Sequence, residues 1–115
     1  MAQEEFHGAF VFRNQGHGIL SSTYFNTPTP KPYPETAIRN PDSDEKNPFI
    51  GTFETVWIEH GRHVHGHVTI AHHPIHAPAF ELNWIEDAPS SLVWEGIGNI
   101  EGQIMIGCYW ESQQH

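Results

Sequence analysis

The feature that most constrains the fold of this chain is the alternation of apolar and polar side chains, with almost no helical periodicity. In the stretch FELNWIE, which begins at Phe80, every second residue is large and apolar. This period of two is typical of strands that bury one face. Nine prolines and ten glycines separate such stretches. The pattern predicts strands at about 6–13, 18–25, 49–59, 62–71, 79–86, 92–99 and 103–111.

Short stretches rich in turn-forming residues join most of these predicted strands. They are Asn14-Gln15-Gly16, His60-Gly61 and the stretches at 87–91 and 99–102, and tight reversals of this kind make neighbouring strands antiparallel. Seven or eight strands in a flat sheet would expose two edges, whereas closure into a barrel removes both. We therefore expect one all-β domain over residues 1–115, an antiparallel meander that closes into a small barrel. A β-sandwich of two sheets is the alternative.

Residues 26–48 interrupt this pattern with six prolines and no sustained alternation. The segment is predicted to be a long loop, and loops of this length in small domains are usually functional or disordered. Three interpretations remain open: a lid across one end of the barrel, an arm that embraces a second subunit and makes a homodimer, or an excursion without a role.

The region 49–71 gives the most detailed prediction, a hairpin that turns at His60-Gly61. The turn sets four cross-strand pairs on one largely apolar face: Glu59–Arg62, Trp57–Val64, Thr55–Gly66 and Phe53–Val68. The other face then carries Glu54, Val56 and Ile58 opposite His67, His65 and His63. Gly66 leaves a gap beside Thr55 in which a neighbouring aromatic ring could settle. A slip by one residue would exchange the two faces, so the assignment depends on the turn.

Two further observations concern the other predicted strands. The hairpin sequence Phe53-Glu-Thr-Val-Trp57-Ile-Glu59 has an echo 27 residues later, in Phe80-Glu-Leu-Asn-Trp84-Ile-Glu86, which indicates repeated hairpins. In the last strand, one strongly apolar set alternates with a mixed set: Ile104, Ile106, Cys108 and Trp110 with Gln103, Met105, Gly107 and Tyr109. Cys108 is therefore expected to be a small buried side chain rather than a nucleophile.

A short antiparallel meander with aromatic-glycine strand starts, such as Phe49-Ile-Gly51 and Trp94-Glu-Gly96, resembles the calycin group of lipocalin and avidin-like barrels. The resemblance covers about residues 49–111 and concerns architecture rather than a motif. Those families usually carry Gly-x-Trp near the first strand, where this chain has Gly8-Ala-Phe10 and Gly51-Thr-Phe53. No binding residue is therefore carried over. The resemblance implies a barrel interior that holds a small molecule.

The charge balance excludes some classes of partner. Fourteen acidic against five basic residues give a formal net charge of −9, and a surface of this sign repels phosphate backbones, so nucleic acid is not expected as a partner. No stretch approaches the ~20 apolar residues of a membrane-spanning helix. The acidic start MAQEEFHG lacks the apolar run of a secretory signal. A cytoplasmic location without membrane association is the default expectation, and the single cysteine rules out an internal disulfide framework.

Three histidines on one predicted strand, His63, His65 and His67, project to the same side about 6.5–7 Å apart. The hairpin pairing places Glu54 opposite His67, which gives a set of two imidazoles and one carboxylate. Such ligands suit a divalent Zn, Ni or Fe ion. The metal-ligand candidates are therefore His65, His67 and Glu54. The alternatives are a solvated row on the outside of the sheet, or histidines that line a polar interior or a subunit contact.

Large aromatic side chains on inward faces suggest a site for an apolar or aromatic ligand. The predicted ligand-binding residues are Phe53, Trp57, Phe80, Trp84, Trp94 and Tyr109. The alternative is that these rings only fill the core. Our leading hypothesis is an intracellular module that binds a small, partly apolar ligand without covalent chemistry.

An enzyme acting on a small organic substrate is the second hypothesis, through either a metal ion or acid–base catalysis. The catalytic candidates are Glu54, His65, His67 and Glu81, and acid–base catalysis requires that their face of the sheet be enclosed. The sequence contains no Gly-x-Ser-x-Gly, no phosphate loop and no dinucleotide fingerprint. A third hypothesis is an oligomer-forming protein that exchanges its long loop with a partner.

Overall fold

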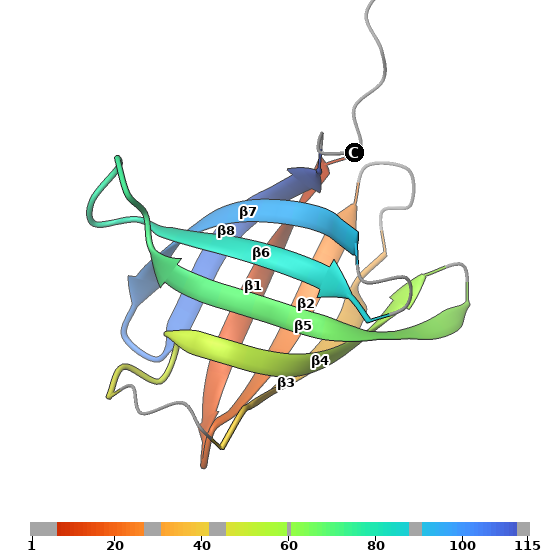
Figure 1. The fold of residues 1–115 in the computed structure, drawn as a ribbon, viewed down its shortest axis with the longest axis horizontal. Coiled ribbons are helices and arrows are strands. Elements are labelled where there is room, and N and C mark those ends of the chain that lie inside the picture. The colour runs from red at the N-terminus through yellow and green to blue at the C-terminus, as the bar shows by residue number, and fades with distance from the viewer. Residues whose placement is uncertain (1–6, 27–30, 42–45, 60, 88–90, 113–115) are drawn as a thin grey trace, which may run out of the picture.

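The computed structural model describes residues 7–26, 31–41, 46–59, 61–87 and 91–112, and within them the chain folds into eight strands (Figure 1). The strands are β1 (His7–Gly16), β2 (Ile19–Asn26), β3 (Tyr33–Arg39), β4 (Gly51–Glu59), β5 (Arg62–His72), β6 (Phe80–Glu86), β7 (Ser91–Glu101) and β8 (Ile104–Glu111). Across these ranges no helix is long and apolar enough to cross a membrane.

The eight strands form one closed barrel in chain order. Each strand pairs antiparallel with the next, and β8 pairs with β1 to close the sheet. The expected all-β architecture, an antiparallel meander closed into a barrel, is therefore confirmed, and the two-sheet sandwich is not formed. Closure satisfies the backbone groups of both strands that a flat sheet would leave at its edges. An eight-stranded barrel has an interior that side chains just fill, or that holds one small ligand.

β3 corrects the prediction that residues 26–48 form one long loop. It pairs with β2 on one side and β4 on the other. The prolines made this stretch read as a loop, but β2 and β4 need a strand between them before the sheet can close. Pro34 lies near the start of β3, where a missing N–H group is best tolerated in a strand. Residues 27–30 and 42–45 of the predicted loop lie outside the described residues, so the lid and the subunit arm stay predictions.

The hairpin of β4 and β5 has the predicted register. Phe53 pairs with Val68, Thr55 with Gly66, and Glu54 with His67. Phe53, Thr55 and Val68 are buried inside the barrel. The apolar face of this hairpin thus lines the interior, and the histidine face is the outer surface. Residue 60 of the predicted His60-Gly61 turn lies outside the described residues.

The last strand corrects a second prediction. Met105 and Tyr109 of β8 are buried, whereas Cys108 is exposed and Trp110 is 37% exposed. The strongly apolar set of β8 therefore faces outward, and Cys108 is not a buried side chain. The inward set fits better because it includes Gly107, which gives room to a large ring: a methyl group there would come within 2.7 Å of the Phe10 ring.

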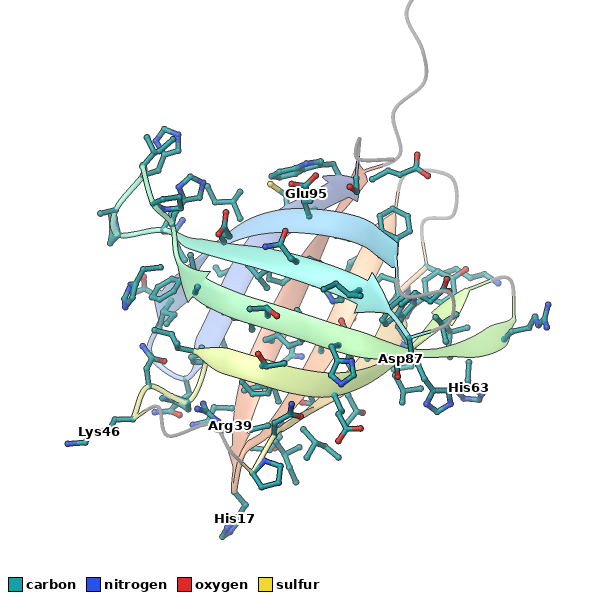
Figure 2. All side chains as sticks on the ribbon, in the orientation of Figure 1. His17, Arg39, Lys46, His63, Asp87 and Glu95 are labelled. Atoms are coloured by element: carbon teal, nitrogen blue, oxygen red, sulfur yellow. The ribbon has the colours of Figure 1, made fainter. Side chains whose placement is uncertain are left out.

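The two ends of the barrel differ in composition. The β1–β2, β3–β4, β5–β6 and β7–β8 connections lie at one end, which we call the β1–β2 end, and His17 marks it in Figure 2. The other three connections lie at the opposite end, the β2–β3 end. Toward the β1–β2 end, the buried side chains carry no nitrogen or oxygen: Phe12, Leu20, Ala37, Phe49, Phe53, Ile70, Phe80 and Met105. These side chains form an apolar core that borders on two buried hydroxyl groups near the middle of the barrel, because Ser22 pairs with Phe12 and Thr55 with Ala37.

Candidate functional site

All three tyrosines of the chain and three of its four tryptophans gather in the half of the barrel toward the β2–β3 end. We call this set the aromatic half: Tyr24, Tyr33, Trp57, Trp84, Trp94 and Tyr109. Tyr33 and Trp94 are partly exposed, while the other four rings are buried. The aromatic half therefore has two partly exposed rings at the end of the barrel and four buried rings deeper inside.

Glu35 on β3 is a carboxyl group buried inside this barrel, with 4% of its surface exposed. Its Oε2 atom accepts a hydrogen bond of 2.7 Å from the Thr55 hydroxyl and one of 2.9 Å from the indole N–H of Trp84. Burial raises the pKa of Glu35 from 4.5 to about 7, because it removes the ionised carboxyl from water, while the two hydrogen bonds act in the opposite direction. Glu35 therefore changes its charge near neutral pH.

Ser22 on β2 is the residue directly across from Glu35. Its side chain is also 4% exposed, and its Oγ atom is buried without a hydrogen-bond partner among the described residues. A buried hydroxyl without a partner costs free energy, so native proteins rarely retain one without a reason. Two buried polar groups thus lie on paired residues of neighbouring strands in the interior of the barrel.

Glycines on the strands make room for the tryptophan rings. A methyl group on Gly66 of β5 would come within 3.0 Å of the Trp57 ring, and one on Gly96 of β7 within 3.0 Å of the Trp84 ring. Each tryptophan of the 27-residue echo therefore lies against a glycine of the following strand. The gap predicted at Gly66 is filled by an aromatic ring, as the sequence indicated.

Two tyrosine hydroxyls fix the wall of the aromatic half. The Tyr24 hydroxyl donates a hydrogen bond of 2.6 Å to the Ile58 carbonyl and accepts one of 3.2 Å from the Ile58 N–H. The Tyr109 hydroxyl donates a hydrogen bond of 3.1 Å to the Phe25 carbonyl. Rings then stack on these anchors, Tyr33 on Tyr24 at 5.6 Å between centroids. These hydrogen bonds and ring contacts hold the aromatic side chains in place.

The structure brings together four of the six predicted ligand-binding residues in the aromatic half: Trp57, Trp84, Trp94 and Tyr109. Phe53 and Phe80 are buried too, but in the apolar half. Glu35, Ser22 and the two other tyrosines were not predicted as site residues. A signal for Glu35 existed, because it stands two residues from both Tyr33 and Ala37 and so shares one strand face with them, but the surrounding prolines obscured it.

The metal-ligand candidates lie on the outer surface of the barrel. His65 and Glu54 are exposed, and the Nδ1 atom of His67 lies 2.8 Å from Oδ1 of Asp87, with the two side chains 36% and 47% exposed. Figure 2 shows His63 and Asp87 projecting from the outside of the barrel. In the part of the chain that the structure describes, no group of three histidine, cysteine or acidic side chains is placed to hold a metal ion. A Zn, Ni or Fe site at His65, His67 and Glu54 stays a prediction.

The four catalytic candidates share that outer surface. Glu81 alternates with the buried Phe80 and Leu82 on β6 and so points outward, as Glu54, His65 and His67 do from their strands. The acid–base hypothesis required this face to be enclosed, and the structure encloses the other face. The enclosed carboxyl is Glu35.

Comparisons with family models, with curated proteins and with solved structures found no match to this chain. The closed barrel of eight antiparallel strands is consistent with the calycin-like architecture that the sequence suggested.

Proposed function

We propose that this protein binds a small, partly apolar molecule within the aromatic half of its barrel. The observation that carries the proposal is the buried Glu35 carboxyl among aromatic rings, with the unpartnered Ser22 hydroxyl across from it. Ligand sites are typically apolar concave surfaces with a few convergent polar groups, and a buried group with a raised pKa often marks one.

Three features of the aromatic half support binding rather than core packing alone. The buried polar side chains, Ser22, Glu35 and Thr55, lie from the middle of the barrel toward this half. The Tyr24 and Tyr109 hydroxyls bond to backbone atoms, which fixes the rings in advance and lowers the entropy cost of binding. Tyr33 and Trp94 remain partly exposed at the end of the barrel, where a ligand would enter.

Nuclear magnetic resonance of the tryptophan indole N–H groups tests this proposal. The four resonances are assigned with single Trp→Phe variants, and a panel of benzimidazole, 2-naphthol, quinoline and naphthalene-2-carboxylate is titrated against the protein. We expect at least one compound to shift the resonances of Trp57, Trp84 and Trp94 to saturation. Trp110, on the outer surface, serves as the internal control and should not shift.

A pair of variants locates the binding. Ser22→Leu fills the interior beside Glu35 and should abolish the shifts, whereas Ser21→Leu changes the outer face of the same strand and should preserve them. The proposal would be overturned by a panel that leaves all three interior resonances unchanged, or by shifts that follow Ser21 rather than Ser22.

A further inference from the structure

Glu35 and Ser22, which pair across β3 and β2, do not use all of their hydrogen-bonding atoms. Thr55 and Trp84 both donate to Oε2 of Glu35, and no described residue donates to Oε1. The Ser22 Oγ atom, on the residue paired with Glu35, is buried without a partner among the described residues. Two acceptor atoms, one carboxyl oxygen of Glu35 and the buried hydroxyl oxygen of Ser22, thus lie on paired residues of neighbouring strands.

The chemistry of these two atoms defines a complementary group. An ionised carboxyl only accepts hydrogen bonds, and a serine hydroxyl both accepts and donates. A ligand with two N–H donors on one side can satisfy both atoms, and a positive charge on that group strengthens both bonds. A carboxylate ligand would instead bring a second negative charge into the site, which the low dielectric of the interior opposes.

The aromatic rings around Glu35 also favour a flat, positively charged ligand. The ring of Trp84, which donates to Glu35, lies 6.1 Å from that of Tyr109 and 5.7 Å from that of Phe10, measured between centroids. Aromatic faces attract cations and stack on flat rings. The net charge of −9 also attracts cationic molecules during encounter.

We propose that Glu35 and Ser22 bind a flat aromatic ring that carries a cationic group with two N–H donors, of the amidinium or amino-heterocycle class. One N–H donates to Oε1 of Glu35 and the second to Oγ of Ser22, while the ring packs against the aromatic half. This inference rests on the proposed function and specifies the chemical class of its ligand.

Three compounds of nearly the same shape test the class: benzamidine, benzamide and benzoate, which carry a cationic, a neutral and an anionic group on one ring. Each is titrated at pH 8 while the Trp84 indole N–H resonance is followed, because this group bonds to Glu35 directly. We expect benzamidine to bind at least about tenfold more tightly than benzamide, as a charge-assisted hydrogen bond predicts, and benzoate to bind most weakly.

Variants assign the preference to the two residues. Glu35→Gln should remove the advantage of benzamidine over benzamide, and Ser22→Ala should weaken benzamidine binding without reversing the order. Glu101→Gln removes one acidic group from the exposed end of β7 and is the matched control, which should leave the advantage unchanged. If Glu101→Gln reduced it as much as Glu35→Gln, a general attraction to an acidic surface would explain the result and the inference would fail.

The outcome also separates this inference from the proposed function. Equal binding of the three compounds, a preference for benzoate, or no binding of any of them would each overturn the cationic class. The wider panel of neutral and acidic compounds decides independently whether the interior binds a small molecule at all.

Discussion

The Thr55 hydroxyl on β4 donates a 2.7 Å hydrogen bond to the Glu35 carboxyl on β3, and so links neighbouring strands inside the barrel. The indole N–H of Trp84 on β6 reaches the same oxygen from another part of the wall. The pKa of Glu35, about 7, is a balance between burial, which raises it, and these two hydrogen bonds, which lower it. The first two predictions follow from this balance.

Thr55→Val should raise the pKa of Glu35 further above its ordinary value, because the substitution keeps the shape of the side chain and removes a donor to the ionised carboxyl. A titration of the Glu35 carboxyl carbon by nuclear magnetic resonance measures the shift. Thr36→Val, on the exposed face of β3, is the control and should leave the titration unchanged. An unchanged or lower pKa in Thr55→Val would contradict the assignment of this hydrogen bond.

The stability of the protein should fall as the pH rises from about 4.5 to about 7. In this window the folded protein keeps a proton on Glu35 that the unfolded chain has lost, so each rise in pH favours the unfolded chain. Below the window both states are protonated at Glu35, and above it both are ionised, so the contribution of this group is then constant. Its full size is about 3 kcal/mol.

The Glu35→Gln variant isolates this contribution from that of the other titratable groups. Denaturant unfolding of both proteins between pH 4.5 and pH 8 gives the difference in their free energies of unfolding. As the pH rises, the free energy of unfolding of the wild-type protein should fall by about 3 kcal/mol relative to that of Glu35→Gln. A difference that stays constant across this range would show that Glu35 does not titrate there.

Gly66→Ala should destabilise the protein by about 1–3 kcal/mol, since the added methyl group would overlap the Ile85 carbonyl oxygen and press on the Trp57 ring. Gly98→Ala is the matched comparison, because its methyl group would meet mainly the flexible side chain of Met105 at 3.0 Å. Urea unfolding measures both variants. A larger loss of stability in Gly98→Ala would contradict the proposal that Gly66 is needed to leave space for the Trp57 ring.

Cys108 should react with a thiol reagent in the folded protein, because it lies on the outer face of β8. Labelling with Ellman's reagent should proceed in native buffer to one thiol per chain, at a rate comparable to that in denaturant. If the thiol were protected in the folded protein, the result would instead support the buried position that the sequence predicted for Cys108.

The sequence by itself determined the strands and the register wherever the two faces of a strand differ strongly. In β4 and β5 the rings and aliphatic side chains fall on one face and the histidines and acids on the other, so only one register buries the apolar set. The same contrast predicted that Trp57 and Trp84 point inward. Local alternation was sufficient there because a slip by one residue would bury several polar groups.

Only the tertiary structure decided the remainder. Both faces of β8 carry large apolar side chains, so its orientation depends on which face gives room to Phe10 from a strand nearly a hundred residues earlier in the chain. The strand β3 forms despite Pro34 and the neighbouring prolines because the sheet must be completed between β2 and β4. Glu35 becomes a buried carboxyl only through that closure. Its spacing from Tyr33 and Ala37 indicates a shared face, but its hydrogen bonds come from Thr55 and Trp84 on other strands, which no local pattern predicts.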